Sequence, residues 1–313
     1  MMLLIQYTLI YASVLILVAL GGMFSERSGV INLGLEGTMV FGALGGAFVL
    51  CLMPEGSSAL SIVVSTLFVS AAAGMVFSLL LAVAAIQFKA DQTLVGTAMN
   101  MLATAAATVV VKSYNNAISG GTNPSAILDY IETRKAFVIK TPLIELNWYM
   151  VVTLVLLIVS CVVLYKTRFG LRLISCGEHP QAADSVGINV YKMRYSGVLI
   201  SGFCGGIGGI IYVSAVNSQW DFIYGVAGAG FLALAVMIFG QWKPVRIALA
   251  ALLFGVFRAI ADTYSGFDFL VHLVPGEVYK TLPYIISLIV LAFTSKKSRA
   301  PKAEGIPYDK SVR

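Results

Sequence analysis

The chain has 313 residues, of which 58% are hydrophobic and only 12% charged, and its mean hydropathy is +0.89. A soluble domain carries about 25% charged residues, so this composition excludes a water-soluble globular protein. The net charge of +6 requires no nucleic-acid partner, because basic loops that face anionic lipid headgroups account for it. We predict an all-α fold, a polytopic bundle of transmembrane helices. A β-barrel is excluded because polar and apolar residues do not alternate in the apolar runs.

About 20 apolar residues form a helix that crosses a hydrocarbon core about 30 Å thick. Uncharged runs of about this length recur along the chain, at residues 1–25, 37–54, 56–88, 92–111, 146–165, 195–220 and 222–242. Two weaker candidates follow: 247–261 is interrupted by Arg258, and 281–295 is short. We therefore expect about nine spans, within a range of eight to ten. The range allows for the glycine-rich stretch 225–230, which can form a broken or re-entrant helix. The first run predicts a permanent span and not a signal peptide, since no basic residue precedes it.

Lysine and arginine are enriched in cytoplasmic loops and therefore predict orientation. With nine spans and a cytoplasmic C-terminus, the N-terminus lies outside, and most basic residues fall in inward loops: Arg27, Lys89, Lys166, Arg168, Arg172, Lys192, Arg194, Lys243 and Arg246. This predicts a transmembrane domain over 1–294, with an extracytoplasmic loop at 112–147 and a cytoplasmic loop at 166–194. The outward loop is expected to carry a short helix or hairpin. The polar segment 295–313 reads as a disordered cytoplasmic tail.

Motifs for catalysis or metal binding are missing from the sequence. Its four cysteines and two histidines lack the spacing of metal ligands. It contains no Gly-x-Ser-x-Gly nucleophile motif and no phosphate-binding Gly-x-x-x-x-Gly-Lys loop. We therefore expect no catalytic residue, metal or cofactor in this chain, and any ATP hydrolysis on a partner.

Polar side chains within the spans are costly in hydrocarbon and mark candidate functional positions. Glu36, Asn100 and Asn217 are the candidates for a translocation path. Glu36 lies between two glycines, where it either bonds backbone amides at a helix break or is solvated at the interface; we favour the first. Arg258 either pairs with Asp262 one turn later or extends to a headgroup, and we favour such a structural role over a place in the path.

Two further patterns concern packing. Glycines recur at four-residue spacing, as in the pairs Gly42 and Gly46, Gly202 and Gly206, and Gly205 and Gly209, which favours close helix packing. Aromatic residues gather on the outward side. They could stack on a base, but an interfacial aromatic belt is the favoured interpretation for Trp220, Phe222, Tyr224, Tyr264, Phe267 and Phe269.

The inward loop at 166–194 contains a short helix signal. Pro180 suits a first helical turn, Glu178 could cap it, and Gly187 would end it with a positive φ angle after about two turns. A helix with small alanines on the cytoplasmic face either fits a cleft of a partner or lies as an ordinary interfacial helix. The pattern alone leaves both open.

Two segments resemble a known family. Residues 177–190 (Gly-Glu-His-Pro-Gln-Ala-Ala-Asp-Ser-Val-Gly-Ile-Asn-Val), together with the glycine-rich run at 201–209, resemble the coupling segment of ABC importer permeases in the branched-chain amino acid, ribose and nucleoside group. Residues 24–37 (Phe-Ser-Glu-Arg-Ser-Gly-Val-Ile-Asn-Leu-Gly-Leu-Glu-Gly) resemble the permeases that work with basic-membrane-protein-type lipoproteins.

The resemblance implies a non-catalytic subunit of a multi-pass importer in the bacterial inner or plasma membrane. Its implied partners are a second permease, an ATP-binding subunit and an extracytoplasmic substrate-binding lipoprotein. Nucleosides are the implied substrates. Simple sugars (ribose, galactose) and riboflavin are alternatives, as is an ion-coupled secondary transporter, which would need several ionisable residues at the midplane. Coupling to the ATP-binding subunit is carried over to Glu178, His179, Pro180, Gln181, Ala182, Ala183, Asp184, Gly187 and Ile188.

Overall fold

The computed structural model describes residues 2–54, 56–139, 146–266, 275–294 and 299–310. Within these ranges, seven helices are long and apolar enough to cross a membrane. They are α1 (Met2–Arg27), α2 (Leu35–Leu52), α3 (Ala59–Ala82) with its π-helical extension η1 (Val83–Gln87), α4 (Gln92–Ile118), α5 (Trp148–Lys166), α8 (Val190–Ser214) and α10 (Pro244–Thr263), which continues as the 3-10 turn η4 (Tyr264–Gly266). The predicted helical membrane bundle is confirmed.

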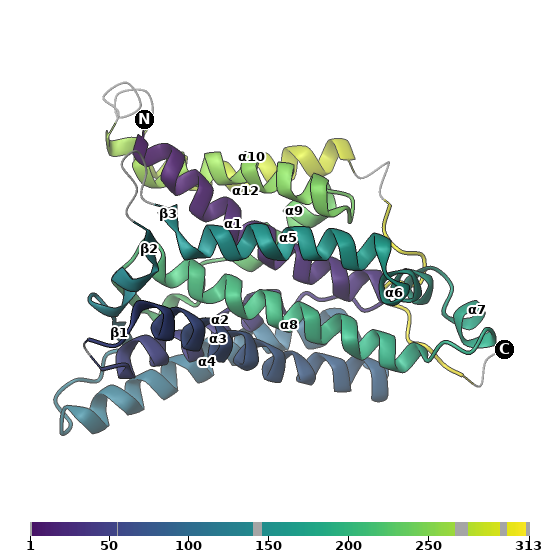
Figure 1. The fold of residues 1–313 in the computed structure, drawn as a ribbon, viewed down its shortest axis with the longest axis horizontal. Coiled ribbons are helices and arrows are strands. Elements are labelled where there is room, and N and C mark those ends of the chain that lie inside the picture. The colour runs from purple at the N-terminus through teal and green to yellow at the C-terminus, as the bar shows by residue number, and fades with distance from the viewer. Residues whose placement is uncertain (1, 55, 140–145, 267–274, 295–298, 311–313) are drawn as a thin grey trace.

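The long helices lie side by side along the longest axis of the molecule (Figure 1). One end carries the start of α1 and the short strands β1 (Ile127–Asp129) and β2 (Val138–Ile139); we call it the β1 end. The opposite end carries α6 (Arg168–Glu178), α7 (Pro180–Ser185) and residues 299–310, and we call it the α7 end. The predicted outward and inward loops thus lie at opposite ends of the bundle.

The predicted run 222–242 is not one continuous helix. It begins with the 3-10 turn η3 (Phe222–Tyr224), passes through Gly225 and Gly228 at φ +56° and +79°, and becomes helical only in α9 (Ala229–Phe239). Because positive φ angles interrupt a right-handed helix, α9 has 11 residues and is too short to cross a membrane alone. The last helix, α12 (Gly276–Thr294), has 19 residues with Pro283 inside it. The number of nine spans and the orientation remain predictions.

The predicted outward loop forms two small antiparallel pairings. Strand β2 pairs with β3 (Leu146–Asn147), as a hairpin would, and β1 pairs with β4 (Gln219–Asp221) from the connection between α8 and α9. Between β1 and β2, the 3-10 turn η2 (Thr133–Phe137) includes Thr133, whose hydroxyl donates to the Leu50 carbonyl at 2.8 Å. The loop is therefore attached both to α2 and to the α8–α9 connection.

Helix α8 is the centre of the bundle and packs against α1, α2 and α3. A Cβ atom at Gly206 would overlap with the carbonyl oxygen of Ser70, and one at Gly209 with that of Met39. The Ser70 hydroxyl lies 2.7 Å from the carbonyl oxygens of both Gly42 and Gly206 and can donate to either. The prediction that the paired glycines serve close helix packing is confirmed.

The prediction of a disordered tail is wrong for residues 299–310, which we call the strap. Tyr308 is only 4% exposed and its ring meets Tyr191 edge-on at 5.3 Å between centroids. The Ala303 amide donates to the Gly177 carbonyl at 2.8 Å, and the Gly305 amide to that of Gly29 at 3.3 Å. These contacts come from three separate parts of the chain, so the polar composition of the tail alone did not reveal them.

Candidate functional site

The segment predicted to couple to a partner folds as two consecutive short helices. The Thr167 hydroxyl accepts from the Gly170 amide at 3.2 Å and caps α6, and Pro180 occupies the first turn of α7. Helix α7 ends as expected: Gly187 has φ +83°, and its amide donates to Asp184 O at 2.9 Å. The Ile188 amide donates to Ala183 O at 3.0 Å. The predicted helix and its glycine end are confirmed.

The two alanines of α7 have different environments. Ala183 is only 2% exposed and packs with Cys176, Val190 and Tyr308, whereas Ala182 is exposed. Only Ala182 is therefore available to a partner, because residues adjacent in a short helix point to different sides. The outward surface of α7 consists instead of Gln181, Ala182, Ser185 and Val186, which is 74% exposed.

Glu178 and His179 connect the two helices, and the expectation that Glu178 caps α7 is wrong. Glu178 is the last residue of α6, and its carboxylate lies 3.9 Å from the guanidinium of Arg27 at the end of α1. His179 is the residue immediately before α7, and its side chain makes no capping hydrogen bond. The His179 carbonyl accepts a hydrogen bond from the Ala183 amide at 3.0 Å. The α6–α7 segment is thus attached to α1.

The strap also contacts the region around α7 and the start of α8. The Arg194 side chain is 1% exposed and donates to the Ile306 carbonyl at 3.0 Å. Glu304 shares a hydrogen bond with Glu26, which accepts a further bond from the Trp242 indole at 2.5 Å. A bond between two carboxyl groups requires a proton on one of them. Burial raises the pKa of Glu304, while the bond to Glu26 opposes this shift.

In the bundle interior, Glu36 and Asn100 bond to the backbone at the starts of two helices, α9 and α2. The Glu36 carboxylate accepts from the Gly228 amide at 2.8 Å and from the Gly230 amide at 2.7 Å, at the start of α9. The Asn100 side chain accepts from the Gly37 amide and donates to the Leu33 carbonyl, both at 2.8 Å, at the start of α2. The preferred interpretation of Glu36, a carboxylate that bonds amides at a helix break, is confirmed.

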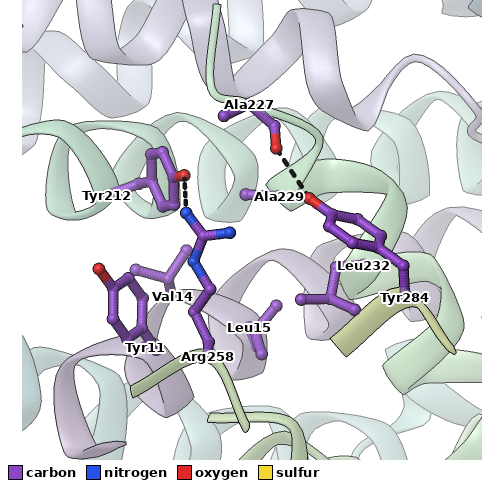
Figure 2. A pocket seen from close by; sticks show the side chains of 9 residues that line it. All are labelled: Tyr11, Val14, Leu15, Tyr212, Ala227, Ala229, Leu232, Arg258 and Tyr284. Carbon is purple, nitrogen blue, oxygen red and sulfur yellow. Dashed lines mark hydrogen bonds between the residues drawn. The ribbon is translucent and has the colours of Figure 1, made fainter. Parts of the chain in front are cut away.

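A second polar cluster joins α1, α8 and α10 (Figure 2). The Arg258 guanidinium donates to the Tyr212 hydroxyl at 3.1 Å and lies 5.6 Å from the centre of the Tyr11 ring. Its Nε lies 3.9 Å from the carboxylate of Asp262, which also accepts a bond from the Tyr11 hydroxyl. Of the two alternatives for Arg258, the ion pair with Asp262 is the one observed, and its charges neutralise each other among tyrosine side chains.

Two cavities adjoin this cluster. A cavity of about 400 Å³ is lined by Asn217 and Trp220 as well as by Arg258. A much smaller one of about 10 Å³ lies between Arg258, Ala227 and Tyr284, whose hydroxyl donates to the Ala227 carbonyl at 3.0 Å (Figure 2). Tyr11, Tyr212 and Arg258 line both cavities and therefore form the wall between them.

Comparison with known proteins identifies the family. A family profile described as "Branched-chain amino acid transport system / permease component" matches residues 4–291. The chain belongs to this family of ABC transporter permeases. The permease is therefore a multi-pass bacterial membrane protein.

Individual relatives align over most of the permease. It is 40% identical to the guanosine ABC transporter permease protein NupQ of Bacillus subtilis, over 98% of this chain and 96% of the relative. It is 37% identical to the nucleoside ABC transporter permease protein NupC of Lactococcus lactis, over 97% of this chain and 95% of the relative. Identity to the putative glucose ABC transporter permease protein TsgC13 of Haloferax volcanii is 32%, over 78% of this chain and 72% of the relative.

The sequence-predicted path residues do not form one cluster in the permease. Asn100 bonds the backbone on both sides of Glu36, whereas Asn217 lines the 400 Å³ cavity beside Arg258. Glu36 and Asn100 are both 9% exposed and bonded to backbone, so their observed role is structural. Their part in a path, like the docking role of residues 178–188, remains a prediction.

Sequence reasoning missed Tyr11, Tyr212 and Tyr284, which stand singly in apolar runs. The spacing of Arg258 and Asp262 was the only available signal for this cluster. The aromatic-belt interpretation is wrong for Phe222, which is fully buried, whereas Tyr224 is 71% exposed. Trp220 and Tyr264 line the 400 Å³ cavity, and Phe267 and Phe269 lie outside the described residues.

Proposed function

We propose that the permease forms half of the translocation path of an importer for nucleosides. The observation that carries this proposal is the identity of 40% and 37%, over nearly the whole chain, to two relatives named for guanosine and nucleoside transport. The relative named for glucose shares less identity over a smaller part of the chain, which favours nucleosides over simple sugars.

A separate ATP-binding subunit drives this transport and docks at the α7 end. The support is geometric: α7 presents small exposed side chains, Ala182 and Ser185, and is fixed from behind by the buried Ala183. Only four residues separate α7 from α8, the central helix of the bundle. A displacement of α7 is therefore transmitted to α8 through a short linker.

The α7 end faces the cytoplasm and the β1 end faces outward in this proposal. The basic residues at 166–172 and 192–194 belong to the α7 end and support this orientation by the positive-inside rule. A second permease completes the path, and an extracytoplasmic lipoprotein delivers the substrate at the β1 end. These partners follow from the family resemblance.

Uptake in a strain that lacks the permease tests the proposal. Complementation should restore uptake of labelled guanosine, and unlabelled adenosine or uridine should compete better than ribose, galactose or riboflavin. ATP depletion should abolish accumulation. Preferential competition by a sugar or riboflavin would overturn the substrate class. Accumulation by the purified chain alone, driven by a proton gradient, would overturn the permease-subunit assignment in favour of a secondary transporter.

A further inference from the structure

The 400 Å³ cavity at the β1 end has the size and lining of a small-molecule site. Ligand pockets typically measure about 300–1,000 Å³. Its walls come from the first half of α1, the end of α10 and the connection that follows α8. The lining combines aromatic rings with an amide, a carboxylate and a guanidinium, a mixture suited to a ligand with both a flat face and many hydrogen-bonding groups.

The aromatic side chains are held in defined positions. The Trp220 indole donates to the Gly225 carbonyl at 2.8 Å, and its ring meets that of Tyr212 edge-on at 5.6 Å between centroids. Tyr7 and Tyr11 form a second, tilted pair at 6.3 Å on the α1 wall. Rings fixed in this way lose little conformational entropy when a planar base stacks on them.

The polar lining carries no net formal charge, because Arg258 and Asp262 neutralise each other at 3.9 Å. A phosphorylated ligand would add negative charge without a counterion, which is costly in a partly buried site. Hydrogen-bonding capacity nevertheless remains. Asn217 lines the cavity, and its side chain makes no hydrogen bond to any residue that the structure describes. The lining therefore suits a neutral solute with hydroxyl and amide groups.

The cavity is closed toward the bundle interior. Tyr11, Tyr212 and Arg258 separate it from the inner cavity of about 10 Å³, which has room for roughly one water molecule. Figure 2 shows the residues that line the inner cavity. Beyond the inner cavity lie Ala227 and the start of α9, where Glu36 bonds Gly228 and Gly230. A ligand in the 400 Å³ cavity would thus contact Tyr11, Tyr212 and Arg258, which separate it from the interrupted segment before α9.

We propose that this cavity binds the nucleoside within the permease, with the base on the aromatic walls and the ribose hydroxyls on Asn217, Asp262 and Arg258. The proposal rests on the proposed function, since it assigns a place to that substrate. It also distinguishes nucleosides from nucleotides: guanosine binds and guanosine monophosphate does not.

Cysteine protection in membranes that contain the complete transporter tests this site. In a background in which Cys51, Cys161, Cys176 and Cys204 are alanine and which retains guanosine uptake, Asn217→Cys should react with a membrane-impermeant thiol reagent. Guanosine should slow this reaction severalfold, and guanosine monophosphate or ribose should not. Thr122→Cys, on the exposed part of the outward loop, is the control and should react at the same rate with and without guanosine.

A second measurement needs no cysteine-free background. Trp220→Ala should reduce guanosine uptake at least severalfold at normal membrane abundance, and Trp220→Phe should retain most of it. Tyr224→Ala removes a ring that is 71% exposed and outside the cavity, and should leave uptake unchanged. Normal uptake by Trp220→Ala, or labelling of Asn217→Cys that guanosine does not slow, would overturn the site while wild-type guanosine uptake leaves the proposed function intact. Absence of guanosine uptake by the wild type would overturn both.

Discussion

Helices α8 and α7 follow each other in the chain but are held in opposite ways. In α8, 78% of an 18-residue apolar stretch is buried. The glycines of α8 allow its backbone to contact the backbones of α2 and α3 directly. Helix α7 has six residues and is fixed by two buried side chains, Pro180 and Ala183, by the neighbouring ion pair of Glu178 and by the strap. Backbone contact leaves α8 no alternative packing, whereas the few side-chain contacts of α7 can be rearranged.

This difference suits the transmission of movement. The Asn189 side chain accepts from the Lys192 amide at 2.9 Å and caps α8 immediately after α7. A displacement of α7 therefore acts on a capped helix end, and the close contacts of α8 with α2 and α3 carry the displacement to those helices together. The predictions below test whether substitutions in the two regions differ as this comparison requires.

The largest effect is expected in α8. Gly209→Val should abolish the recovery of folded protein, because its side chain would overlap with the backbone of Met39, and overpacking a dense core costs about 1–3 kcal/mol or more. Val159→Ile in α5 is the control, since Val159 is 46% exposed and has room for a methylene. The yield of monodisperse protein in detergent is the measurement. An equal yield for both variants would contradict the close contact.

The second prediction compares the two alanines of α7. Ala183→Arg should loosen the α7 end, because a buried charge without a partner costs roughly 3 kcal/mol or more. Ala182→Arg should leave the permease folded but reduce co-purification of the ATP-binding subunit. Limited proteolysis of the strap distinguishes the two: it should accelerate only for Ala183→Arg. If Ala182→Arg retains normal co-purification and uptake, α7 is not the docking helix.

The third prediction concerns pH. Because burial raises the pKa of Glu304 above its ordinary value near 4.5, the folded state favours the protonated carboxyl. The resulting stabilisation of the strap is complete below about pH 4.5 and is lost as the pH rises through the raised pKa. Hydrogen exchange of residues 299–310 should therefore be slower at pH 5 than at pH 8, after correction for intrinsic rates. Glu304→Gln should reduce this difference; an unchanged pH dependence would exclude Glu304 as a contributor.

The smallest effect is expected at the surface of the strap. Lys89 lies 2.5 Å from the Asp309 carboxylate, with side chains 41% and 39% exposed. Exposed ion pairs contribute little to stability, so Lys89→Gln should leave uptake and the proteolysis of the strap unchanged. Faster proteolysis of this variant would show that the strap depends on a single surface contact.

The sequence predicted those features that arise from local patterns. Apolar runs predicted the long helices, Pro180 and Gly187 predicted the limits of α7, and the glycine-rich stretch 225–230 predicted the break before α9. Features that depend on distant contacts were not predictable from one sequence. Which alanine of α7 is buried depends on Tyr308, more than 100 residues later, and the Arg258 cluster depends on tyrosines from separate helices. The order of residues 299–310 likewise depends on acceptors at Gly29 and Gly177.

The strap also has a consequence for biosynthesis. Residues 299–310 leave the ribosome after every helix described above, yet they complete the surroundings of Ala183 and Arg194. Chains fold progressively from the N-terminus during synthesis. A truncated permease that has inserted all its helices therefore still lacks the contacts that hold α7, the helix that we propose docks an ATP-binding subunit. Under that proposal, assembly of the transporter selects subunits that carry the strap.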